Sequence, residues 1–188
     1  MAYKVGVFIG SLSTRSINRR LARGLFCLAP EGLDLMEIPI RDLPLYNYDF
    51  DPDFPPEGRA LKAAVEAVDA LMFVTPEYNR SIPGALKNAI DWGSRPWGKN
   101  SFAHKPSAVI GTSPGAISTA VAQQHLRSIL SFVNSPELAQ PEAYIQYRDG
   151  LITDDGEVTD PTTAEFLRTW LGAFEVFIGK VCSVNRPK

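Results

Sequence analysis

A serine-rich loop near the N-terminus carries the residue types that hold a phosphate. It follows a short apolar stretch and reads Gly10-Ser11-Leu12-Ser13-Thr14-Arg15-Ser16-Ile17-Asn18. The Ser and Asn side chains can donate hydrogen bonds and Arg15 adds a positive charge. A helix that begins at about Ser16 would direct its free N–H groups to the same point. The loop favours one phosphate monoester, because neither GxGxxG nor GxxxxGKS/T occurs in it. A serine-rich turn that caps a helix is the alternative.

A second polar segment begins where another apolar run ends. It reads Thr75-Pro76-Glu77-Tyr78-Asn79-Arg80-Ser81-Ile82-Pro83-Gly84. The prolines stiffen the turn, Tyr78 offers a flat apolar face, and Glu77 and Asn79 offer polar groups. A rigid ribbon with exposed backbone N–H and C=O groups can bind the edge of a heteroaromatic ring. A connection that only turns the chain would explain the same residues.

A third segment, Gly111-Thr112-Ser113-Pro114-Gly115, matches the G-x-S-x-G pattern of serine hydrolases. That pattern uses the backbone N–H of the residue after the serine, and Pro114 has none. His125 is the one histidine after Ser113, and no Asp or Glu lies between them. A hydrolase that uses Ser113 is therefore disfavoured, and the segment favours a glycine loop that a flat group can approach closely.

Apolar periodicity places these segments in an alternation of strands and helices. Short apolar-rich stretches predict strands over residues 3–9, 33–38, 70–74, 106–110 and 143–145, and of these 70–74 is a continuous apolar run. Residues 39–56 are expected to form a long loop. Helical spacing predicts helices from about residues 16, 61, 83, 121 and 161. This alternation predicts an α/β fold with a parallel sheet and helices on both faces. Ligands of such sheets bind at the carboxyl ends of the strands, so the three polar segments are expected to meet.

Composition limits the classes of function. The 188 residues are 45% hydrophobic and 21% charged, which suits a single domain over residues 1–188. The net charge of −2 without a basic cluster disfavours nucleic acid as a partner. No apolar run approaches the roughly 20 residues that span a membrane, and no signal peptide is evident, so a cytoplasmic protein is expected. Cys27 and Cys182 are expected to be buried, and two histidines make a histidine metal site implausible.

Taken together, the motifs resemble the NADPH-dependent FMN reductase family, and more narrowly its chromate and quinone reductase branch. The resemblance rests on the serine-rich loop, on Pro76-Glu77-Tyr78-Asn79, and on Ile82-Pro83-Gly84-Ala85-Leu86-Lys87-Asn88-Ala89-Ile90-Asp91-Trp92. It continues through Lys105-Pro106 and residues 111–115 to the last helix, and so covers nearly the whole chain. It implies a flavodoxin-like three-layer sandwich with a five-stranded parallel sheet, bound FMN, and NADPH or NADH as electron donor. A homodimer or homotetramer is usual, and Trp92 and Trp97 would suit an interface.

The resemblance also assigns the site residues. The FMN phosphate would be held by the loop that contains Ser11, Ser13, Arg15, Ser16, Ile17 and Asn18. Members of the branch often carry a basic residue where this chain has Ser13, and Arg15 would supply that charge. The flavin ring would lie against Pro76, Glu77, Tyr78 and Asn79 on one side and Ser113 and Gly115 on the other.

Because the flavin carries the chemistry, no side chain is predicted to be catalytic. The electron acceptor would be a small molecule such as a quinone, free flavin or chromate. A non-enzymatic FMN electron carrier is the alternative. Such carriers are typically far more acidic than a chain with a net charge of −2.

Overall fold

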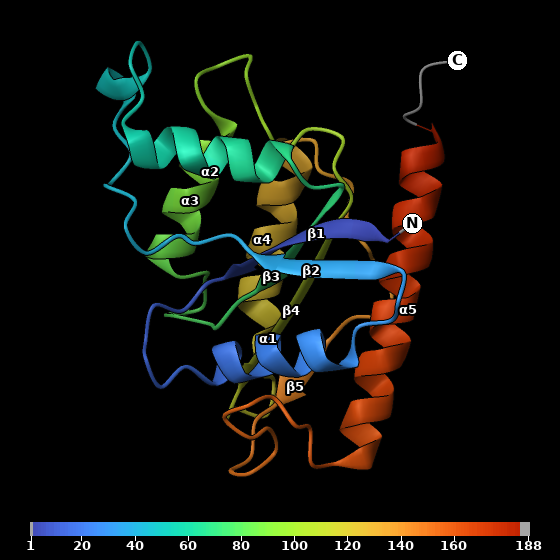
Figure 1. Ribbon diagram of the computed structural model, residues 1–188. Helices are drawn as coiled ribbons and strands as arrows, with labels where there is room; N and C mark the ends of the chain where they lie inside the picture. Colours follow the sequence, from blue (N-terminus) through green and yellow to red (C-terminus); the bar gives the residue numbers. More distant parts are fainter. Residues whose placement is uncertain (1, 185–188) are drawn as a thin grey trace.

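The computed structural model describes residues 2–184 as a parallel sheet between two layers of helices (Figure 1). The expected alternation of strands and helices is confirmed. In chain order the elements are β1 (Tyr3–Ile9), α1 (Ile17–Leu28), β2 (Leu33–Glu37), the 3-10 helix η1 (Tyr48–Phe50), α2 (Pro56–Glu66), β3 (Ala70–Val74), α3 (Gly84–Ser94), β4 (Ser107–Ser113), α4 (Ala120–Phe132), β5 (Tyr144–Gln146) and α5 (Pro161–Val184).

The strand order is β2-β1-β3-β4-β5, with every pair parallel. The chain runs from β1 outward to β2 and then returns to the other side of β1 as β3, so the order reverses between β1 and β3. This is the flavodoxin-like order. Ile9 at the end of β1 pairs with Val74 at the end of β3, and Val74 pairs with Ile110 of β4. The loops after these three strands therefore begin side by side.

Two apolar layers cover the sheet. On one face, alternate strand residues such as Met72 and Val74 pack with α1 and α5. On the other face, Leu71 and Phe73 pack with α2, α3 and α4. Because successive side chains of a strand point to opposite faces, a strand covered on both sides must be apolar at every position. All five residues of β3 are accordingly buried.

Strand β4 runs two residues beyond Gly111, where the sequence predicts a loop. The segment from Gly111 to Ser113 pairs with β5. Glycine is needed here because of close packing and not because of a turn. A Cβ at this position would lie 2.1 Å from the Thr75 carbonyl oxygen and 2.4 Å from Thr119 Oγ1. The expectation of a loop from Gly111 is therefore wrong.

The long segment between β2 and α2 packs on Trp92. The Trp92 ring is fully buried, with Tyr46, Phe50 and Phe54 around it. Its Nε1 donates to the Pro44 carbonyl over 2.7 Å. Trp92 is thus a core residue and cannot serve an interface, whereas Trp97 is 76% exposed.

The prediction that both cysteines are buried is wrong. Cys27 is exposed and Cys182 is half-buried. Each lies on a helix with one face toward solvent. Apolar periodicity by itself does not show how much of that face a neighbouring segment covers. None of the helices within residues 2–184 has the length and hydropathy needed to cross a bilayer.

Candidate flavin site

A cleft of about 260 Å³ lies at the carboxyl ends of β1, β3 and β4. It gathers every residue that the sequence predicts for the site except Asn79 and Gly115. Two further residues, Thr112 and Pro114, were missed, because the sequence places no ligand-binding signal on them. The lining residues are Ser11, Ser13, Arg15, Ser16, Ile17, Asn18, Pro76, Glu77, Tyr78, Thr112, Ser113 and Pro114.

The three serines of the loop after β1 accept hydrogen bonds from the backbone. Ser11 Oγ accepts from the amide of Ser13 (3.4 Å), and Ser13 Oγ accepts from the amide of Arg15 (3.2 Å). Ser16 caps α1 by accepting from the amide of Arg19 (3.1 Å). A hydroxyl that accepts still has its own proton to donate. The loop is therefore shaped by its serines while their O–H groups stay available to a phosphate.

The N-terminus of α1 adds further donors to the cleft. First-turn amides have no carbonyl of their own helix to bind, and Ser16 satisfies the amide of Arg19. The amides of Ile17 and Asn18 remain at the helix end. The first turn of α1 contains no acidic residue, so nothing there opposes the favourable field of the helix dipole on an anion.

The Asn18 side chain has a structural partner. Its Nδ2 donates to the Thr112 carbonyl (2.9 Å), and its Oδ1 accepts from the Thr112 amide (3.0 Å). The residue is 1% exposed, so both bonds are buried. Asn18 thus ties the start of α1 to β4, and its side-chain amide is already engaged in this link.

The segment after β3 forms a tight hairpin. Tyr78 and Ser81 exchange two backbone hydrogen bonds, of 2.9 and 3.0 Å. Asn79 and Arg80 between them have positive φ of 51° and 64°. This is the backbone of a two-residue turn of type I′, in which Asn is favourable and Arg is not. Positive φ at a residue other than glycine costs about 1–3 kcal/mol, so surrounding contacts must hold the turn.

Both ends of this hairpin are anchored to α4. Glu77 Oε2 accepts from the Ala122 amide (3.0 Å), and His125 Nδ1 lies 3.1 Å from Ser81 Oγ. The N-cap residue of α4, Thr119, makes no side-chain cap, so Glu77 supplies one from another element. A carboxylate at a helix N-terminus is stabilising by about 0.3–1 kcal/mol. The Glu77 carboxylate is therefore engaged, and the ring-binding groups left in the segment are its backbone and the half-exposed Tyr78 ring.

The loop after β4 closes the other side of the cleft. Ser113 Oγ accepts from the Gly115 amide (3.2 Å), and Gln146 Nε2 donates to the Pro114 carbonyl (3.2 Å). His125 is bonded to Ser81 and not to Ser113. Because Pro114 also lacks the amide of an oxyanion hole, the serine hydrolase alternative is excluded.

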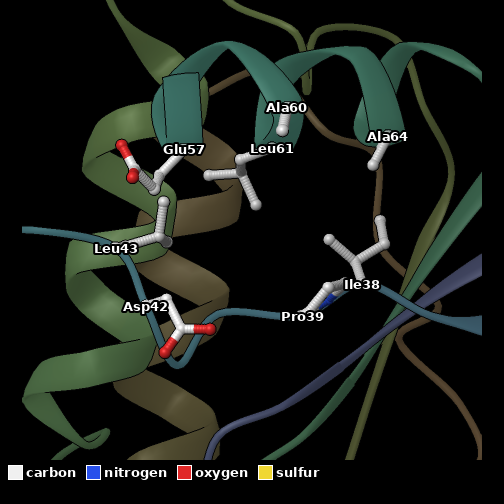
Figure 2. Close-up of a pocket in the computed structure, with 8 residues that line it drawn as sticks. All are labelled: Ile38, Pro39, Asp42, Leu43, Glu57, Ala60, Leu61 and Ala64. Atoms are coloured by element: carbon white, nitrogen blue, oxygen red, sulfur yellow. The ribbon is translucent and has the colours of Figure 1, made fainter. Parts of the chain in front are cut away.

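A separate pocket of about 230 Å³ lies between α2 and the segment that follows β2. Figure 2 shows Ala60, Leu61 and Ala64 of α2 facing Ile38, Pro39 and Leu43, with the carboxylates of Asp42 and Glu57 at the rim. Apolar walls would offer a phosphate no hydrogen bonds, and the two carboxylates would repel it. The cleft of the serine-rich loop is therefore the phosphate-competent site of the two.

Comparison with known proteins identifies the family. A sequence model of NADPH-dependent FMN reductases matches residues 3–149. The chain belongs to this family. It is 44% identical over 178 residues to a 2-hydroxy-1,4-benzoquinone reductase of Burkholderia sp, covering 95% of this chain and 97% of that protein. It is also 44% identical over 177 residues to a quinone reductase of Pseudomonas putida, covering 94% of this chain and 95% of that protein.

A solved structure agrees with this assignment. The flavoenzyme NAD(P)H:(acceptor) oxidoreductase FerB of Paracoccus denitrificans matches with a TM-score of 0.91 and 46% identity, covering 95% of this chain and 98% of that chain. The flavodoxin-like fold is confirmed, and the chain is an FMN-dependent NAD(P)H oxidoreductase. The donor set of the cleft fits FMN, because hydroxyls, helix amides and one arginine suit a single terminal phosphate.

Proposed function

We propose that the protein passes two electrons from NADPH or NADH, through FMN in the cleft, to a small acceptor of the quinone class. The observation that carries this is the cleft lined by serine hydroxyls, the first residues of α1 and Arg15 at the carboxyl ends of β1, β3 and β4, beside a tight hairpin. The names of the relatives support a quinone as the acceptor. Free flavin and chromate are the other acceptors to test.

The proposed roles of the residues follow from their contacts. The hydroxyls of Ser11, Ser13 and Ser16, the first amides of α1, and Arg15 would hold the phosphate. Pro76, Glu77 and Tyr78 line the cleft and, with the adjacent Asn79, would lie along one side of the flavin ring. Ser113 also lines the cleft and, with Gly115, would lie at the other side. The chemistry that bound FMN supplies is two-electron exchange, so the chain's own task is to bind and orient.

We further propose that residues 1–188 form one FMN-binding domain that assembles as a homodimer or homotetramer. Exposed aromatic residues favour interfaces, and Trp97 and Phe132 are 76% and 75% exposed. Arg95 lies over the Trp97 ring at 5.7 Å, which adds a second residue type common at interfaces. Light scattering that gives the monomer mass of 20.7 kDa at micromolar concentration would contradict the assembly. The cytoplasmic location remains a prediction from the sequence.

The test of function combines flavin identity with steady-state kinetics. We expect the purified protein to release FMN on denaturation, and NADPH or NADH to bleach the bound flavin without any other protein. Initial rates against NAD(P)H at several fixed quinone concentrations should give parallel double-reciprocal lines. The reason is that one open ring face, with no second dinucleotide fingerprint in the chain, must serve donor and acceptor in turn.

Three outcomes would count against the proposal. Release of FAD, or no flavin binding after incubation with FMN, would contradict the proposal that the cleft binds FMN. Intersecting lines would mean that donor and acceptor bind together. Bleaching that needs a separate reductase would favour the electron carrier.

A further inference from the structure

Arg41 contacts the serine-rich loop, residues 10–18, from a different part of the chain. It lies in the segment after β2, and its Nη2 donates to the Leu12 carbonyl. Leu12 stands between Ser11 and Ser13, which both line the cleft. The Arg41 guanidinium therefore contacts the backbone of the loop at Leu12, whose two neighbours in the sequence are proposed phosphate donors. A guanidinium carries five N–H donors, and this contact uses one of its nitrogens.

The charges around the loop are not equally available. Arg19 is bonded through both of its Nη atoms to Glu37, at 2.7 and 2.9 Å. Arg20 is bonded to Asp154 at 2.7 Å and to the Tyr147 hydroxyl at 2.8 Å. These two cations are compensated by carboxylates of their own.

Arg15 and Arg41 are different. Within residues 2–184, neither lies within ion-pair distance of a carboxylate. Both are exposed, and both belong to or touch the loop. A phosphate monoester carries a charge of about −1.5 to −2 at neutral pH. One exposed arginine neutralises about half of that charge, and a second would complete the neutralisation.

We propose that Arg41 is the second cation of the FMN phosphate site. It holds the loop through the Leu12 carbonyl and directs its remaining N–H groups and its charge to the phosphate. Arg41 is then a binding residue supplied from beyond the loop, 29 residues along the chain from its contact. The inference rests on the proposed function, since it assigns a residue to the phosphate end of the same cofactor.

The experiment compares FMN with riboflavin, which has the same ring and lacks the phosphate. Full-length protein is stripped of flavin and titrated with each compound by fluorescence. The variants are Arg41→Gln, which removes the charge, and Arg41→Lys, which keeps the charge without the planar fork. Arg168→Gln, an exposed arginine on α5, is the control for a lost surface charge.

We expect Arg41→Gln to weaken FMN roughly 10- to 100-fold, the effect of one lost charge-assisted hydrogen bond. Riboflavin affinity should change less than about twofold, Arg41→Lys should lie between, and the control should match the wild type. The salt dependence of FMN binding should also become shallower in Arg41→Gln, because exposed charges are screened by salt.

Two results would overturn the inference. Unchanged FMN affinity would remove Arg41 from the site. Equal losses for FMN and riboflavin would show that Arg41 only shapes the loop. Circular dichroism checks that each variant is folded, and Arg41→Lys provides the comparison if Arg41→Gln is not. Failure of the wild type to bind FMN would instead contradict the proposed function, so the two failures are distinguishable.

Discussion

Replacing Asn18 with alanine removes a buried link between α1 and β4. The Asn18 amide makes one hydrogen bond as donor and one as acceptor with the backbone of Thr112. Alanine leaves the Thr112 N–H and C=O without these partners in a place that is 1% exposed. These two hydrogen bonds form only in the folded protein, so removing them lowers the stability of the native state relative to the unfolded chain. The variant therefore tests whether Asn18 is a structural residue or a phosphate ligand.

The expected magnitude follows from the two bonds. A typical hydrogen bond contributes about 1 ± 0.5 kcal/mol, and a buried group left unpaired costs about 1–3 kcal/mol. Asn18→Ala should thus lower the free energy of unfolding by about 2–4 kcal/mol. Each kcal/mol lowers Tm by about 2–4 °C in a protein of this size. Thr14→Ala, an exposed change in the same loop, should stay within about 0.5 kcal/mol of the wild type.

The assay is urea unfolding of the flavin-free protein, followed by circular dichroism, and then FMN titration of the same variants. Removing flavin matters because a ligand that binds the native state raises apparent stability. A loss below about 1 kcal/mol in Asn18→Ala would refute the reasoning. Normal stability with much weaker FMN binding would show that the side chain turns to the phosphate, as the sequence by itself suggested.

Two further predictions concern the anchors of the loops. Glu77→Gln keeps an oxygen that can accept from the Ala122 amide but loses the negative charge at the start of α4. It should therefore lower the free energy of unfolding in urea by about 0.3–1 kcal/mol, and Glu77→Ala should lower it more. Equal stability of the two variants would mean that the cap is not formed. Burial, with a hydrogen bond to Asp51, raises the pKa of the Tyr46 phenol from 10.0 to about 12. Since the folded pKa is the higher one, this group stabilises the fold fully below pH 10.0, and its contribution is lost as the pH rises toward 12. The difference between the ultraviolet titrations of the wild type and Tyr46→Phe should correspond to one phenol that ionises well above pH 10.0, and a Tyr46 that ionises near pH 10.0 would contradict this.

The sequence by itself determined the elements and the place of the site. Apolar periodicity located the strands and helices because each element buries one face or both. The alternation of the two required a parallel sheet, whose strands end at a common edge. The three polar segments after β1, β3 and β4 could therefore be expected to meet, and the residues of the cleft are nearly those expected.

The tertiary structure decided which partner each side chain takes. Asn18 bonds to Thr112, 94 residues away, and Glu77 caps a helix that begins 43 residues after it. The hairpin at Asn79 and Arg80 carries no turn signal such as Asn-Gly, and contacts to α4 hold it instead. Local sequence sets periodicity and turn preference, but a hydrogen-bond partner depends on how separate elements pack. For the same reason, three features could be seen only once the elements were assembled. They are the extension of β4 beyond Gly111, the burial of Trp92 and the contact of Arg41 with the serine-rich loop.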